Sequence, residues 1–250
     1  MLATKAPSRR NFHRGLSPFK GAAWRGIPVL AEVLLLARKD LQIEWRAKVA
    51  LGQVAPLTLL IVVIFAFALD ANAPLLELGA GGLYWVAILY GGTLLTQRSF
   101  ELETEDGNID GFRMSPMKVH SLFLGKALAL FVQIGLLEIV LGPVILLFYD
   151  VQVANWALLV TAGVAGTMAF SVCGVLWGVM AAGLRVRATL LPLLLVPVLA
   201  PVLLAGSRAF ETALGVRADA GWSWTSLMFV IAAVHTVVGL GTFGFLLEES

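Results

Sequence analysis

Six apolar segments, each about as long as a membrane is thick, dominate this chain. A hydrocarbon core about 30 Å thick is crossed by roughly 20 apolar residues in an α-helix. The segments are Val49–Leu69, Gly79–Leu95, Leu122–Phe148, Trp156–Ala182, Ala188–Gly206 and Thr225–Leu247. We therefore expect an all-α integral membrane protein with six transmembrane helices.

The composition fits lipid and excludes an ordinary soluble domain. Of the 250 residues, 59% are hydrophobic and only 14% are charged, which is too little polar surface to cover a water-exposed fold. The single cysteine, Cys173, lies inside an apolar segment, so it can form neither an intramolecular disulfide nor a cysteine metal cluster. We expect no nucleic-acid partner and no metal or cofactor bound by the chain itself.

The distribution of Lys and Arg predicts the topology, because basic residues accumulate on the cytoplasmic side of membrane proteins. Connections 70–78 and 149–155 hold no basic residue, and connection 207–224 holds two. The amino-terminal end holds ten of the eighteen, and the connections after the second and fourth segments hold three and two. Both termini are therefore predicted to be cytoplasmic, with 207–224 as a long outer connection whose Trp222 and Trp224 anchor at the outer interface.

Residues 1–30 are predicted to be a basic cytoplasmic extension. Their Ser8–Phe12 run resembles the start of a twin-arginine export signal, but no uninterrupted apolar stretch or cleavage site follows it. Next, Val33–Ala50 alternates apolar and charged residues, which predicts an amphipathic helix in the membrane interface with its cations toward headgroups. We interpret this helix as a structural anchor, with a binding role as the alternative.

Prolines and glycines within the segments bear on their packing. Pro192, Pro197 and Pro201 are expected to kink the fifth segment and to place it inside the bundle or along a path. Gly174 and Gly178 form a GxxxG pair, for which we expect a close helix contact, with dimerisation as one option.

The most informative polar stretch is Gln97–Lys126, which is cytoplasmic in the predicted topology. It interleaves acidic residues with aromatic and aliphatic ones, a content that an ordinary solvated loop does not need. Gly107 and Gly111 punctuate two short helical pieces, and Pro116 marks a break before the third segment. A short acidic and aromatic helix on the cytoplasmic face suits docking onto a soluble partner. The alternative is a solvated helix that has no partner.

The same stretch fails the patterns of two ligand sites. Its acidic spacing does not match a calcium loop, and Gly125 and Lys126 do not complete a phosphate loop because His120 stands where Gly is required. The chain is therefore expected not to hydrolyse ATP by itself. Lys126 is expected to extend to the inner headgroups.

Three polar residues inside the segments are functional candidates, because an unpaired polar group in lipid is costly. Glu138 is either a satisfied structural carboxyl or a lining residue, and Gln133 lies about 140° around the same helix, so no relay between them is predicted. His235 is interpreted as a neutral ring bonded to a nearby carbonyl rather than as a haem or metal ligand.

Several motifs together carry a family resemblance. They are Arg38–Asp40, Gly82–Val86, Arg98–Glu101, the acidic and glycine-containing run Glu105–Pro116, Leu122–Lys126 and Pro192–Pro201. Together they resemble the haem exporter protein B (CcmB) family of cytochrome c maturation, over roughly residues 30–247. Single pieces of this pattern also occur in other exporters of the ABC-2 superfamily.

The resemblance implies an ABC-2-type transmembrane domain over residues 31–250 of a permease in the bacterial inner membrane. Its six helices would follow an interfacial helix, with a coupling helix between the second and third. The permease, not itself an enzyme, would pair with a CcmA-like ATPase that binds ATP and Mg. A CcmC-like membrane subunit and a CcmE-like chaperone would handle haem, the substrate of a homodimeric or hetero-complex assembly. The residues implied in ATPase coupling are Arg98, Phe100, Glu101, Glu105, Asp106, Gly107, Gly111 and Pro116.

Two other interpretations stay open at this point. The same coupling arrangement permits an ABC-2 exporter of another substrate, such as a lipid or a drug. A non-transporting assembly protein, whose cytoplasmic loop only holds partners together, is the second. Fold-level analogy alone does not choose among substrates.

Overall fold

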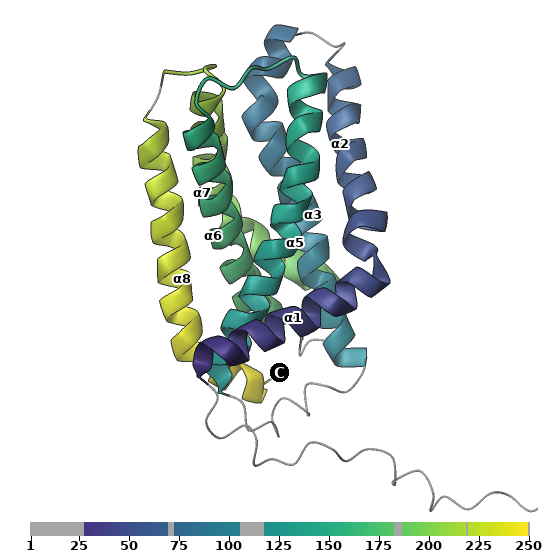
Figure 1. The fold of residues 1–250 in the computed structure, drawn as a ribbon, viewed down its shortest axis with the longest axis vertical. Coiled ribbons are helices and arrows are strands. Elements are labelled where there is room, and N and C mark those ends of the chain that lie inside the picture. Colours follow the sequence, from purple (N-terminus) through teal and green to yellow (C-terminus); the bar gives the residue numbers. More distant parts are fainter. Residues whose placement is uncertain (1–27, 70–72, 106–117, 183–186, 219, 250) are drawn as a thin grey trace, which may run out of the picture.

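Long helices stand side by side in one bundle, and a further helix lies across one end of it (Figure 1). The computed structural model describes residues 28–69, 73–105, 118–182, 187–218 and 220–249. The helices are α1 (Val29–Ala47), α2 (Ala55–Ala68), α3 (Ala73–Glu105), α5 (Val119–Phe148), α6 (Trp156–Ala182), α7 (Arg187–Ala213) and α8 (Gly221–Glu249). A short π-helix, Ala50–Val54, leads into α2.

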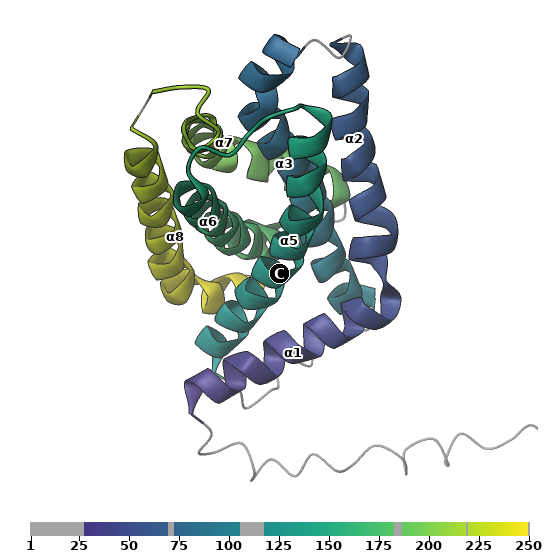
Figure 2. The same cartoon turned by 45° about the horizontal axis from the view of Figure 1, so that its top comes forward.

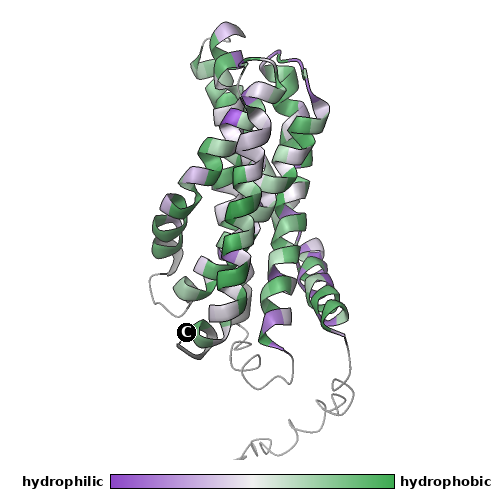
Figure 3. Ribbon diagram, turned by 90° about the vertical axis from the view of Figure 1, so that its left-hand side faces the viewer, coloured by the Kyte–Doolittle hydropathy of each residue, from purple (hydrophilic) through white to green (hydrophobic). Residues whose placement is uncertain are grey.

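Five of these helices, α3, α5, α6, α7 and α8, are long and apolar enough to cross a membrane. A sixth crossing is present among the described residues if α1 and the segment Gly52–Ala68, which are bent by 48° relative to each other, count as one span. Figure 3 shows hydrophobic residues along most of the length of the long helices. The described part of the chain is therefore all-helical, with several membrane-crossing helices, as the apolar segments predict.

One predicted boundary is wrong in a way that changes the end of the bundle opposite α1. The fifth helix continues to Ala213 and the last one begins at Gly221, so the connection between them is much shorter than the predicted Ser207–Trp224. Gly215, with φ +75°, ends α7, and the Val216 N–H bonds back to a carbonyl in the last turn, which is a Schellman ending. Trp222 and Trp224 thus lie in the first turn of α8.

Helix α1 packs against α5 and crosses the end of the bundle in both views (Figures 1 and 2). The approach is close, because a Cβ built on Gly125 of α5 would lie 2.7 Å from the Leu36 Cβ of α1. Both ends of the described chain, residues 28 and 249, also lie at this end, which we call the α1 end.

Glycines let the bundle close around large side chains. The indole of Trp85 on α3 fits between Gly166 of α6 and Gly206 of α7, and neither glycine has room for a Cβ. The GxxxG pair behaves likewise, since Phe100 packs on Gly178 and a Cβ on Gly174 would lie 3.0 Å from Thr96 Oγ1. The predicted close contact is confirmed, and it joins α6 to α3 within the chain.

Helix α7 is continuous through Pro192, Pro197 and Pro201. It packs against α3, α6 and α8 on one side, whereas Leu193 and Leu204 are exposed on the other, so it is not enclosed by the bundle.

Candidate functional site

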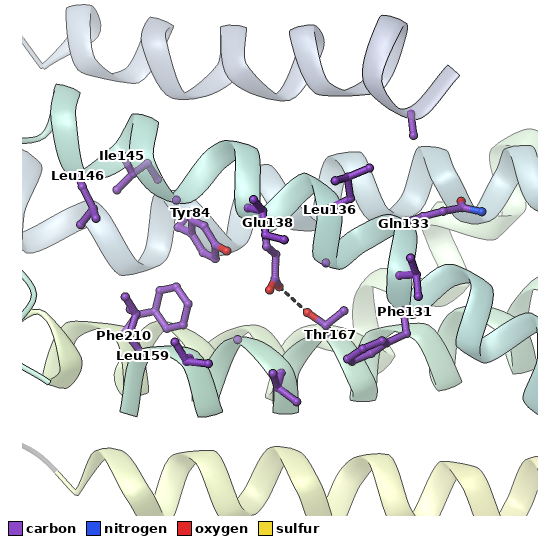
Figure 4. Close-up of a pocket in the computed structure, with 18 of the residues that line it drawn as sticks. Tyr84, Phe131, Gln133, Leu136, Glu138, Ile145, Leu146, Leu159, Thr167 and Phe210 are labelled. Atoms are coloured by element: carbon purple, nitrogen blue, oxygen red, sulfur yellow. Dashed lines mark hydrogen bonds between the residues drawn. The ribbon is translucent and has the colours of Figure 1, made fainter. Parts of the chain in front are cut away.

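A cavity of about 1270 Å³ lies among α1, α3, α5, α6 and α7. Small-molecule sites usually measure about 300–1,000 Å³, so this space can hold a large ligand. Most of its wall is aliphatic or aromatic, with a few polar side chains among them (Figure 4). A mostly apolar cavity with few polar groups suits an amphipathic molecule.

Glu138 of α5 contributes a carboxyl group to the middle of this wall (Figure 4). Thr167 of α6 donates a hydrogen bond to Glu138 Oε1 with an oxygen–oxygen distance of 2.6 Å. Gly163, one turn earlier on α6, leaves room for the other oxygen, because a Cβ there would lie 3.2 Å from Oε2. Beside them, the Tyr84 and Phe210 rings pack with centroids 4.7 Å apart. Glu138 is thus both partly satisfied and lining, and the Thr167 partner lies too far along the chain for sequence to predict.

The other two polar candidates are placed differently. Gln133 lines the same cavity, but Figure 4 shows its amide pointing away from the Glu138 carboxylate. His235 belongs to α8, where its Nδ1 lies 2.9 Å from the Ile231 carbonyl oxygen of the preceding turn. The structure therefore brings Glu138 and Gln133 to one cavity and leaves His235 outside it. Among the described residues, no group of three or more His, Cys, Asp or Glu could hold a metal ion.

Lys126 contradicts its expected position at the headgroups. Its side chain is only 4% exposed, and its Nζ lies 3.7 Å from Asp40 Oδ2 on α1. The same ammonium donates to Ser99 Oγ at 3.0 Å and lies 4.8 Å from the centre of the Phe100 ring, both on α3. Partners from two other helices surround the cation, so it stays inside the protein.

The residues implied in ATPase coupling are described only in part. Phe100 is buried against Gly178, and the Nε of Arg98 is buried with no hydrogen-bond partner in the ranges that the structure covers. Glu101 and Glu105 belong to the last turns of α3, and their side chains lie outside the description. The other four, Asp106, Gly107, Gly111 and Pro116, also lie outside the described residues.

Acidic residues of α1 turn toward the bundle, a feature that the sequence analysis missed. Glu32 Oε2 accepts a hydrogen bond from Ser121 Oγ of α5 at 2.6 Å, and Glu44 accepts one from the N–H of Ala50 at the start of the π-helix. With Asp40 they are spaced by eight and four residues, which places them on one side of a helix. That spacing is the signal that could have identified a docked side of α1.

The end of the bundle opposite α1 has its own ion cluster. Glu211 Oε2 lies 2.8 Å from Arg217 Nε and 3.4 Å from an Arg208 guanidinium nitrogen. Ser207 donates to its Oε1 at 3.2 Å. The two basic residues of the predicted outer connection are therefore both paired with one carboxylate.

Comparisons with known proteins agree on one family. The family model described as CcmB protein matches residues 31–246. Heme exporter protein B of Haemophilus influenzae is 29% identical over 180 residues, covering 72% of this chain and 81% of that protein. The same-named protein of Pseudomonas aeruginosa is 28% identical over 204 residues, with 81% and 91% covered, and that of Paracoccus denitrificans is 29% identical over 206 residues, with 82% and 92% covered. The chain belongs to the CcmB protein family.

Proposed function

We propose that this chain is the membrane permease subunit of an ABC transporter complex for c-type cytochrome biogenesis. The observation that carries the proposal is the CcmB match over residues 31–246, whose relatives are named heme exporter protein B. The complex exports haem or releases a haem-loaded chaperone. ATP hydrolysis belongs to a separate CcmA-like subunit, and this chain is not an enzyme by itself.

The proposed topology has six spans in the bacterial inner membrane, with both termini in the cytoplasm. The π-helix and α2 together form the first span, and α1 lies in the cytoplasmic interface. Support comes from the exposed cations of α1, which suit the side that attracts basic residues, and from the two ends of the described chain, which share the α1 end. Arg208 and Arg217, at the opposite end, share the single carboxylate of Glu211, which offsets part of their charge.

The proposed mechanism couples the ATPase to the bundle through residues 98–118. Closure of the ATPase dimer on ATP would move this segment, which connects α3 to α5. Lys126 supports a path beyond it, because it binds Ser99 on α3 and Asp40 on α1 while itself belonging to α5. A displacement of the carboxyl-terminal end of α3 would therefore be transmitted through Lys126 to α5 and α1.

The proposed assembly includes a CcmC-like haem-handling membrane subunit and a CcmE-like chaperone, with the permease as a homodimer or in a hetero-complex. The Glu138 cavity has the size and polarity for a large amphipathic ligand. We assign it to the transport cycle of this complex.

Complementation tests the proposal. A host that lacks its own B subunit receives this chain with its cognate partners, and covalent haem in c-type cytochromes is stained after electrophoresis. Restored staining that disappears when the ATPase is inactivated is the expected result. No restoration, with the chain shown to be inserted and bound to its ATPase, would instead favour an ABC-2 exporter of a lipid or drug. Restoration that survives ATPase inactivation would favour an assembly scaffold.

A further inference from the structure

Helix α1 presents its acidic residues and its arginines on different sides, and its lysine, Lys39, lies 3.9 Å from Asp40. Its three acidic residues, Glu32, Asp40 and Glu44, are held by α5 or by the π-helix. Its two arginines, Arg38 and Arg46, are exposed, and neither forms an ion pair within the part of the chain that the structure describes. The outward side of the helix therefore offers guanidinium groups without carboxylate partners.

The two arginines border a groove. Arg38, Gln42 and Arg46 follow one another at four-residue spacing, so they form one stripe of the helix. They line a space of about 590 Å³ between α1 and α5, and Leu128 and Val132 form its α5 side. Hydrogen-bond donors of the two arginines and apolar side chains of α5 therefore line the same groove.

This groove adjoins the large cavity, because Leu41, Trp45 and Val132 line both spaces. Trp45 is 71% exposed, so its indole covers the junction without being packed into the core. From the arginines, apolar wall continues along α5 as far as Glu138. A molecule with an anionic head and a long apolar tail matches this sequence of surfaces.

We propose that the groove binds one anionic phospholipid from the leaflet in which α1 lies. The phosphate sits between Arg38 and Arg46, since a guanidinium presents a fork of donors that fits phosphate oxygens. One acyl chain runs past Leu128 and Val132 into the cavity. The inference depends on insertion in a membrane and not on which substrate the transporter moves.

The test uses the full-length chain in detergent and two lipids with the same brominated acyl chains, phosphatidylglycerol and phosphatidylcholine. Bromine quenches nearby indoles, and the difference between the wild type and Trp45→Phe isolates Trp45 from the other six tryptophans. Phosphatidylglycerol is expected to quench Trp45 at lower concentration than phosphatidylcholine. Arg38→Gln and Arg46→Gln should each raise the half-quenching concentration of phosphatidylglycerol about fivefold.

Lys39→Gln is the matched control, because it removes the same charge from the same helix but does not line the groove. It should leave the quenching nearly unchanged. A loss as large as that of Arg38→Gln, or equal quenching by both lipids, would overturn the proposal.

A variant that changes no charge keeps the test decisive if the arginine variants misfold. Leu128→Phe narrows the groove, and it should weaken phosphatidylglycerol binding while the thermal unfolding midpoint stays close to that of the wild type. Unchanged binding in this variant would place the lipid elsewhere and refute the site.

Discussion

The ammonium group of Lys126 lies 3.7 Å from Asp40 Oδ2, and this ion pair ties α1 to α5 at the α1 end of the bundle. The two side chains are 4% and 17% exposed, so water screens the pair weakly. Ser99 of α3 accepts from the same ammonium at 3.0 Å. One cation thus holds three helices, two of which flank the segment proposed to meet the ATPase.

Replacing one partner of this pair should destabilise the protein. Asp40→Asn removes one carboxylate from the buried Lys126 ammonium, which is expected to cost about 3 kcal/mol. The double variant Asp40→Asn/Lys126→Met should recover part of that loss, because it also removes the buried cation that has lost this carboxylate. Thermal unfolding midpoints in detergent measure both effects.

Lys39→Met provides the control for charge removal on α1. Lys39 Nζ also lies 3.9 Å from Asp40 Oδ1, but its side chain is 44% exposed, so this pair contributes little. Its midpoint should stay near that of the wild type. A double variant less stable than Asp40→Asn would show that the ammonium is satisfied without Asp40.

The contact between α3 and α6 should resist even a methyl group. Gly178→Ala drives a Cβ into the Phe100 ring, and overpacking of this kind costs about 1–3 kcal/mol. Phe100→Leu in the same chain should restore part of the stability. Gly241→Ala is the matched control, because nothing lies within 4 Å of a Cβ at that membrane-helix glycine. Equal unfolding midpoints for the two alanine variants would rule out the tight packing.

Sequence alone predicts the apolar helices well, because length and hydropathy are local properties. The segment Trp156–Ala182 coincides with α6, and Leu122–Phe148 differs from α5 by three residues at its start. The extension of α7 to Ala213 was missed, since polar residues there suggest a loop. They remain helical because Glu211 pairs with Arg208 within the helix and with Arg217 just after it.

The candidate site was predicted less completely, because its partners come from distant parts of the chain. Glu138 was found as a polar residue in an apolar segment, but its donor Thr167 belongs to another helix. Lys126 was placed at the headgroups, and no local pattern shows that Asp40 and Ser99 bind it instead. Pairing across helices is a tertiary property that a single sequence does not display.

The proposed coupling segment should separate insertion from function. Glu105→Lys reverses a charge in the acidic stretch expected to meet the ATPase, and Gly107→Pro alters its backbone freedom. Each variant should insert normally yet lose stimulation of the partner's ATPase activity and most of the cytochrome yield. Asp150→Asn, in the connection between α5 and α6 at the opposite end, is the control. It removes a charge but keeps a residue type that tolerates the φ of 51° there, so it should retain both. Normal stimulation in the two loop variants would refute coupling through this segment.

Variants in the Glu138 cavity can distinguish a transport role of the Glu138 carboxylate from a purely structural one. Gly163→Ala places a Cβ 3.2 Å from Glu138 Oε2 and displaces the carboxylate, whereas Gly135→Ala lies on the same cavity wall with nothing within 4 Å. Thr167→Val removes the donor to Oε1, which should cost about 1 kcal/mol.

If the position of the carboxylate matters for transport, Gly163→Ala and Glu138→Leu should both lower covalent haem in cytochromes while Gly135→Ala does not. The thermal unfolding midpoint, measured on the same preparations, should change little in Gly163→Ala. Normal haem staining in Glu138→Leu would leave the carboxyl with a packing role only, since a side chain of similar size without oxygens would then suffice.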